Sequence, residues 1–412
     1  MRCILVLFLC VAHTSFSKSR FVRVVFNSNA SKEATILWDQ YRGHFLDLYI
    51  DTVPPSRNNF AHSKNLTNEN HAKGMHTCSI KLSDLKPSTK YYFAIKDTEG
   101  IGRTYYFSTV SNNPNDRLSL IAGGDSRDVR TVRIKANKMV AKLKPHAVLF
   151  NGDFINLDLN HQWKEWFEDW EYTIGADGRI TPLVVSRGNH ERSNKVIVHL
   201  FAVPHRKLFY NTEFGGNLIN VISLNSEILK IGGQKIFLRK TLEEHKDYYW
   251  QLPQYHRPIR AHVKFKKEMN TQYRNFVPLF EKYKNVRLCL ENDSHTCKIT
   301  WPILSSKKET AEEGFERNDS LGIVYAGEGC WGAPLRTPDD LKSWTRDAGK
   351  VNQFNLIFVS KSKIELRTVM YENVDSVNAI SESNRFNLPL NLNLFGPNNG
   401  KVVDILPATD RK

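Results

Sequence analysis

Long apolar runs are almost absent from this 412-residue chain. The one such run, Cys3 to Ala12, is too short to span a bilayer. Arg2 precedes it and the small residues Ser15 and Ser17 follow it, which is the pattern of a secretory signal. We therefore expect residues 1–17 to be cleaved, with a membrane anchor as the alternative. The mature protein is then expected to be secreted, or to lie in the lumen of the secretory or lysosomal pathway or in a bacterial periplasm.

Cysteine is also rare, with six residues in the whole chain. Four of them follow the signal: Cys78, Cys289, Cys297 and Cys330. An even number permits disulfides in an oxidising compartment, whereas free buried thiols are the other interpretation.

Dense runs of Lys and Arg are missing, although 58 Lys+Arg against 43 Asp+Glu give a net charge of +15. The excess favours an anionic substrate or surface. Without a basic cluster we expect no nucleic-acid role beyond a nucleotide as substrate. The chain also lacks internal repeats and a Gly-x-Ser-x-Gly elbow, which argues against a Ser/His/Asp hydrolase. Its length and its 41% apolar residues are typical of two globular domains.

Residues 20–110 contain short runs rich in β-branched and aromatic residues, separated by turn residues. The expected strands are Phe21–Phe26, Glu33–Asp39, Phe45–Asp51, Thr77–Leu82, Tyr91–Lys96 and Arg103–Thr109. Leu85, Pro87 and Tyr91, with Trp38 before them, resemble the corner of a fibronectin type III sandwich. No acid, base or metal-ligand cluster is evident here. We expect this region to support the next domain, with a binding module as the alternative.

Beyond the turn-rich segment 112–116, helical and strand patterns alternate, which predicts an α/β layered domain over residues 117–372. Apolar spacing predicts helices at 129–144, around Trp163–Trp170, and at 235–245 and 270–284. The expected strands include 218–225, 248–255, 285–290, 321–327 and a single strand at 354–366. Residues 373–412, rich in Asn, Ser and Pro, are expected to form an extended tail.

Three strand-like runs of this second domain each end on a glycine followed by a polar residue. Asp125 follows Gly124, Asp153 follows Gly152, and Asn189 follows Gly188. Such positions bring ligands to the carboxyl edge of a sheet. The order Gly-Asp, Gly-Asp, Gly-Asn-His-Glu resembles the calcineurin-like metallophosphoesterase superfamily, and the purple acid phosphatase branch in particular. This resemblance implies an αββα layered sandwich and a metal-dependent phosphoric ester hydrolase.

The resemblance also assigns metal ligands. Asp125 would bind the first metal, Asp153 would bridge the two metals, and Asn189 would bind the second. His256, in Gln-Tyr-His-Arg-Pro, would bind the second metal, and His295 the first.

His190 would lie beside the metals, contact the phosphate, and either stabilise the transition state or protonate the leaving alkoxide. Arg127 and Arg187 are candidates for clamping phosphate, unless they pair with Asp128 or Glu191. His262 is a candidate second acid, although its spacing favours a surface role.

Two positions depart from the family pattern. Asp293 stands where a histidine is usual. A carboxylate there would shift the preference toward Mn, Fe or Mg over Zn; alternatively the second metal is loosely held or the site has decayed. Asn156 replaces the tyrosine that gives the purple colour, so the protein should not be purple and a preference for ferric iron is in doubt. Asn156 is then either a weak ligand or a turn residue.

Taken together, the motifs predict a phosphatase that hydrolyses phosphate monoesters by attack of metal-bound hydroxide. Two metal ions (Fe, Mn or Zn) are the expected cofactors and a phosphorylated compound the expected substrate. The alternatives are a phosphodiesterase acting on nucleotides or lipid head groups, and a catalytically degraded scaffold that acts as a binding protein.

Overall fold

The computed structural model describes residues 17–54 and 63–409. The predicted signal segment lies almost wholly outside the described residues. Among the described residues, no helix has both the length and the apolar character needed to cross a bilayer.

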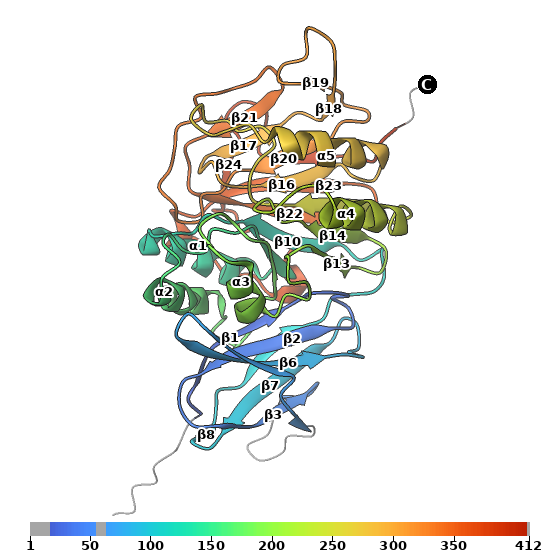
Figure 1. Cartoon of the computed structure of the whole chain (residues 1–412). Coiled ribbons are helices and arrows are strands. Elements are labelled where there is room, and N and C mark those ends of the chain that lie inside the picture. Colours follow the sequence, from blue (N-terminus) through green and yellow to red (C-terminus); the bar gives the residue numbers. More distant parts are fainter. Residues whose placement is uncertain (1–16, 55–62, 410–412) are drawn as a thin grey trace, which may run out of the picture.

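The N-terminal region is all-β, as predicted, and forms the lower part of the molecule in Figure 1. One layer contains β1 (Ser19–Val25), β2 (Ala34–Gln40), β6 (Met75–Leu82) and β5 (Asn68–Ala72) in that order. The other contains β3 (Phe45–Asp51), β4 (Ser63–Lys64), β7 (Lys90–Asp97), β8 (Gly100–Ile101) and β9 (Tyr105–Ser108). Trp38 and Phe45 meet between the layers, with ring centroids 5.1 Å apart.

The two parts of the chain share a sheet, which the sequence did not predict. β1 pairs in parallel with β12 (Leu183–Val185), and Val25 is opposite Leu183. The resulting 11-stranded sheet continues through β11 (Ala147–Phe150) and β10 (Leu118–Gly123) to β22 (Gln353–Val359), β23 (Ile364–Met370) and β24 (Asn393–Phe395). The N-terminal layer therefore extends the α/β sheet directly.

A second mixed sheet faces this one. Its order is β13 (Tyr210–Phe214), β14 (Ile219–Ser223), β15 (Trp250–Gln254), β16 (Leu288–Glu291), β20 (Val324–Gly327), β17 (Cys297–Thr300) and β21 (Thr345–Gly349). A small hairpin, β18 (Ile303–Ser305) and β19 (Phe315–Arg317), projects beyond it.

Helices cover the outer faces of the two sheets. The core that contains β10–β12 also contains buried residues of α1 (Arg130–Leu143), α2 (Asn160–Trp170) and α3 (Asn194–Phe201). A separate core joins α4 (Gly233–Glu244) and α5 (Asn270–Lys282) to the second sheet. The predicted aromatic stripe of α2 belongs to the first core, because Trp163, Trp166 and Trp170 are all buried.

The expected single strand at 354–366 is wrong. The chain turns back at residues 360–363, so β22 and β23 form an antiparallel hairpin. Ser360 makes this turn without glycine or proline: its side chain accepts a hydrogen bond from the backbone N–H of Lys363.

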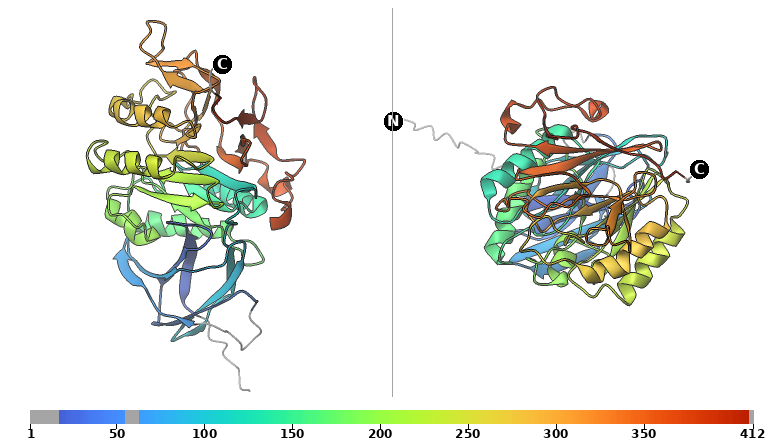
Figure 2. Two further views of the ribbon diagram at one scale, coloured as in Figure 1. Left: turned by 90° about the vertical axis from the view of Figure 1, so that its right-hand side faces the viewer. Right: turned by 90° about the horizontal axis from the view of Figure 1, so that it is seen from above.

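The C-terminal segment adds β24 and β25 (Val403–Ile405) to β23. Seen from above in Figure 2, it lies on the opposite side of the molecule from α4 and α5. Short 3-10 turns occur at Glu171–Thr173, Val374–Ser376 and Glu382–Asn384. Glu382 holds this segment in place through ion pairs to Lys90 at 2.9 Å and Arg179 at 2.8 Å.

Candidate metal centre

The candidate ligands lie directly after strands of the two facing sheets. Asp125 follows β10 and Asp153 follows β11, which are parallel neighbours. In the second sheet, His256 follows β15 and Asp293 follows β16, which are also parallel neighbours. Since the carboxyl ends of parallel strands share one edge, these side chains converge from both sheets.

Four of the candidate ligand residues, among them His295, have left-handed backbone angles. The φ values are 56° at Asp125, 54° at Asp153, 75° at Asp293 and 57° at His295. Non-glycine residues rarely adopt this conformation, and it concentrates at functional sites. The surrounding structure therefore determines the direction of these side chains.

The first cluster consists of Asp125, Asp153 and His295. One ligand atom of each lies within 4.8 Å of the others. His295 Nε2 is 3.4 Å from Asp125 Oδ1. All three residues are buried, so an ion held here would be largely shielded from solvent.

The second cluster consists of Asp153, His256 and Asp293, again within 4.8 Å. His256 Nε2 lies 3.3 Å from Asp153 Oδ1 and 3.6 Å from Asp293 Oδ1. The amide oxygen of Asn189 is 3.2 Å from the same nitrogen. Asp153 is therefore common to both clusters, which is the arrangement expected of a bridging carboxylate.

Backbone carbonyls orient both histidines. Nδ1 of His256 lies 2.8 Å from the carbonyl oxygen of Asn151, and Nδ1 of His295 lies 3.1 Å from that of Pro334. A hydrogen at Nδ1 makes each contact a hydrogen bond and leaves Nε2 as the acceptor. Metal-binding histidines commonly have such partners.

The donor set fits metal ions. Asp125 Oδ1 and Asp153 Oδ2 are buried and have no hydrogen-bond partner within the described residues. Buried carboxylate oxygens without a partner are costly unless a cation satisfies them. Carboxylate, amide and imidazole ligands together suit Mn, Fe or Zn.

The local potential also favours positive charge at this point. Burial alone would lower the pKa of His256, but Asp153 and Asp125 outweigh it and raise this pKa well above its ordinary value. Burial would raise the pKa of Asp153, whereas His256 and His190 lower it below the usual range.

Lys266 is a cation that the sequence did not indicate. Its ammonium lies 2.7 Å from Asp293 Oδ1. Burial opposes ionisation of Asp293, yet His256 and Lys266 hold its pKa well below the usual range. A carboxylate paired with a lysine has the same net charge as the neutral histidine that is usual at this position.

Arg127, Asn156 and His190 lie together at the rim of the centre. Arg127 Nη1 is 3.4 Å from His295 Nε2, and Arg127 Nε donates to Asn156 Oδ1 at 3.1 Å. His190 Nδ1 contacts the carbonyl oxygen of Asn156, and its Nε2 is 3.7 Å from Asp153 Oδ2. The amide oxygen of Asn156 is thus used by Arg127.

Two other candidate residues have contacts elsewhere. Arg187 donates to the carbonyl oxygen of Glu191 and to Asn194 Oδ1, both at 2.7 Å. His262 is fully buried, with Nε2 2.7 Å from Thr345 Oγ1, so its expected surface position is wrong.

Glu191 and Asn292 are support residues that the sequence analysis missed. The Glu191 carboxylate accepts hydrogen bonds from the backbone N–H groups of Asp153, Phe154 and Gly188 at 3.1, 2.7 and 2.7 Å, and so joins two ligand loops. Asn292 donates to Asp125 Oδ2 at 2.9 Å. Glu191 is the last residue of the Gly-Asn-His-Glu motif, whereas Asn292 has no sequence signal beyond its adjacency to Asp293.

Comparison with known proteins identifies the second domain. Residues 121–295 match the calcineurin-like phosphoesterase family. No curated protein sequence matches the chain significantly.

Two of the solved structures with a similar fold match over more than nine-tenths of this chain. One is the purple acid phosphatase PPD1 of yellow lupin (Lupinus luteus), with a TM-score of 0.69 and 14% identity over 91% of this chain and 76% of that chain. The other is PhoD, with a TM-score of 0.65 and 11% identity over 95% of this chain and 93% of that chain. The family match confirms the predicted superfamily for residues 121–295, and the two solved structures show a similar fold.

Proposed function

Because residues 121–295 are a calcineurin-like phosphoesterase domain, a domain of metal-dependent phosphoric ester hydrolases, we propose that this chain hydrolyses phosphate monoesters at two metal ions that share Asp153. The observation that carries the proposal is the pair of ligand clusters with Asp153 in common.

The residues divide into two ligand sets. Asp125, Asp153 and His295 would hold one ion, and Asp153, Asn189, His256 and Asp293 the other. When bound, such ions acidify a water molecule and neutralise charge on the phosphoryl oxygens. Fe, Mn and Zn are all compatible with these ligands.

His190 is suited to proton transfer at the leaving group. Its Nδ1 faces the carbonyl oxygen of Asn156, which fixes the ring, while Nε2 is directed to the Asp153 side of the centre. A protonated Nε2 can donate to the leaving oxygen, which is the role of a general acid.

A cluster of cations favours a monoester over a diester. Arg127 and Lys266 border the two ligand sets, and Arg336 donates to the carbonyl oxygen of Asp293 at 3.2 Å. A monoester carries up to two negative charges on its phosphoryl group, whereas a diester carries one. The additional charge gains more from three neighbouring cations.

The test is hydrolysis of an aryl phosphate and of the matching aryl phosphodiester by the mature chain with Mn, Fe or Zn added. We expect metal-dependent turnover of the monoester and its loss in Asp153→Asn. Turnover that persists in this variant would contradict the proposal. Preference for the diester would retain the two-metal chemistry but change the substrate class.

One observation favours a second candidate, a binding protein on a degraded scaffold. Lys266 already neutralises the oxygen of Asp293 that would face the second ion. In that case the chain would bind a phosphorylated ligand through its cations without metal-dependent turnover. Tight binding of the aryl phosphate by the chelated protein, with no hydrolysis under any metal, would support this candidate.

The proposal also covers the setting of the domain. We propose that residues 20–110 are a fibronectin type III-like support, since their sheet is continuous with that of the catalytic domain. Secretion, or residence in a secretory lumen, follows from the predicted signal. Detection of the chain in the culture medium of expressing cells, with an N-terminus near residue 18, tests it.

A further inference from the structure

The β5–β6 hairpin brings four potential metal ligands onto one face. Its turn residues, Lys73 and Gly74, both have positive φ, 54° and 69°, as in a type I′ turn. This turn fixes a register in which Glu69 is opposite Cys78 and His71 is opposite His76. Opposed residues of antiparallel strands share a face, as do residues two apart along one strand.

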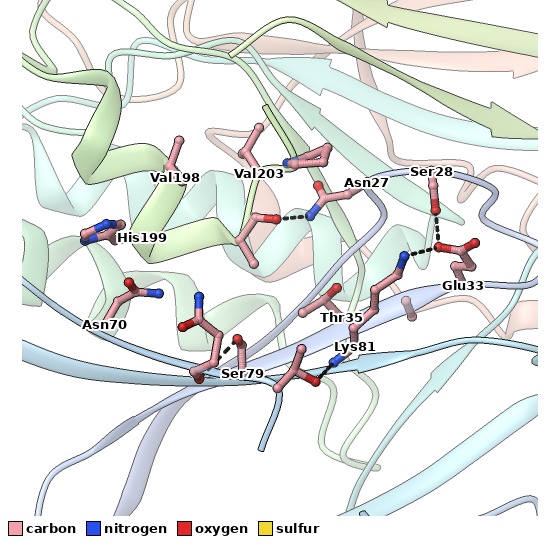
Figure 3. A pocket seen from close by; sticks show the side chains of 15 residues that line it. Asn27, Ser28, Glu33, Thr35, Asn70, Ser79, Lys81, Val198, His199 and Val203 are labelled. Atoms are coloured by element: carbon pink, nitrogen blue, oxygen red, sulfur yellow. Dashed lines mark hydrogen bonds and ion pairs between the residues drawn. The ribbon is translucent and has the colours of Figure 1, made fainter. Parts of the chain in front are cut away.

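The other face of the hairpin lines a cavity and carries none of the four ligands. Asn70, Ser79 and Lys81 line a cavity of about 360 Å³ between β2, β6 and α3, shown in Figure 3. Lys81 is paired there with Glu33 at 2.8 Å. Cys78 is opposite Trp38 instead, so the four ligands face the second layer of the N-terminal region.

Of the distances within the cluster, the one from Glu69 to His76 matches a tetrahedral zinc site and the one from Cys78 to His76 is a few tenths of an ångström longer. Glu69 Oε2 lies 3.3 Å from His76 Nε2, and Cys78 Sγ lies 3.9 Å from the same nitrogen. Bonds of about 2.0–2.1 Å to oxygen and nitrogen and about 2.3 Å to sulfur imply ligand separations of about 3.3–3.6 Å. The His71 ring lies beside the His76 ring, with centroids 4.4 Å apart, so His71 is the neighbouring residue that can supply a fourth ligand.

The cluster is buried on the side of Cys78 and accessible to solvent on the side of Glu69 and His76. Cys78 is fully buried, whereas the side chains of Glu69 and His76 are 51% and 33% exposed. Asp39, also buried, accepts a hydrogen bond from the backbone N–H of His76 at 2.6 Å. Burial, with the charges of Glu69 and Asp39, raises the pKa of the Cys78 thiol to about 12.

We propose that Glu69, His76 and Cys78 bind one zinc-type divalent cation, with His71 as the fourth ligand. Binding replaces the Cys78 thiol proton by the cation, and the proton passes to water. The ion clamps β5, the edge strand of the long sheet, to β6. This proposal departs from the expectation that the N-terminal region carries no metal-ligand cluster, because the ligands meet only across the hairpin.

Cobalt(II) titration of the chelated full chain separates this site from the catalytic centre. A thiolate ligand gives an intense near-ultraviolet sulfur-to-cobalt band, and the two catalytic ligand clusters contain only oxygen and nitrogen donors. We expect the band in the wild type and its loss on adding Zn²⁺. It should be absent in Cys78→Ser and present in Cys330→Ser, which removes a buried thiol near Asp125.

If Cys78→Ser fails to fold, substitutions of the two more exposed ligands, Glu69 and His76, still test the site. Glu69→Gln and His76→Asn should each weaken Zn²⁺ binding at this site by about tenfold or more. His44→Ala, an exposed histidine on β3's side of the region, should leave it unchanged. Absence of the band in the wild type, its persistence in Cys78→Ser, or wild-type affinity in both exposed variants would overturn the proposal.

Discussion

Removing the ammonium of Lys266 should lower the free energy of unfolding of the metal-free protein and raise its affinity for the second metal ion. The Lys266–Asp293 pair spans 2.7 Å, and the two side chains are 18% and 5% exposed. Breaking a fully buried pair costs about 3–5 kcal/mol, and an exposed one about 0–1 kcal/mol. Because the Lys266–Asp293 pair is partly buried, we expect Lys266→Met to lower the free energy of unfolding of the chelated protein by about 2 kcal/mol.

The free energy of the Lys266–Asp293 pair also lowers the affinity of the wild type for the second ion. In the wild type an ion must displace the ammonium from Asp293, whereas in Lys266→Met it meets an unpaired carboxylate. The affinity for the second ion should rise by about 30-fold, which is about 2 kcal/mol at 1.36 kcal/mol per decade.

Urea unfolding of the chelated protein and a competitive Mn²⁺ titration measure the two quantities. Lys267→Met is the matched control, because that side chain is exposed and adjacent. If Lys266→Met changed neither stability nor affinity relative to this control, the pair would have no energetic role and the reasoning would be refuted.

Three further predictions concern the loops and the tail. Gly188→Ala should abolish metal binding, because its Cβ would lie 2.1 Å from Asp153 Oδ1. Gly233→Ala is the control and should keep the metal, because no atom lies nearer than 4.0 Å to its Cβ. Metal analysis of both purified variants checks this prediction. Glu191→Gln should cost about 2 kcal/mol in urea unfolding, since an amide cannot accept at both positions. Burial opposes ionisation of Glu382, but Arg179 leads the groups that lower its pKa from 4.5 to about 2. Its stabilisation is therefore present above pH 4.5 and lost toward pH 2, and acid unfolding of Glu382→Gln should lack this loss.

The fold and the ligand positions were predictable where local sequence determines local structure. Apolar runs that end in glycine and a polar residue marked Asp125, Asp153 and Asn189, and helical apolar spacing marked α1, α2, α4 and α5. The hairpin at residues 360–363 was missed because its turn contains only Ser and Lys, without glycine or proline to interrupt the apolar pattern.

Features that depend on distant pairing could not be predicted. Lys266 reaches Asp293 through the conformation of the loop after His256, and β1 joins β12 across more than a hundred residues. Glu69 and Cys78 lie at the two ends of a segment that also contains His71 and His76, and they meet only through strand register.

The most direct test of the central claim is a crystal structure of the protein soaked with Mn²⁺ or Zn²⁺, with the ions located by anomalous scattering. We expect two peaks, one on either side of the Asp153 carboxylate. One peak should also lie beside Asp125 and His295, and the other beside His256 and Asp293. Lys266 should have moved away from Asp293 in that structure. A single peak, or no peak, with Lys266 still bound to Asp293, would contradict a binuclear centre.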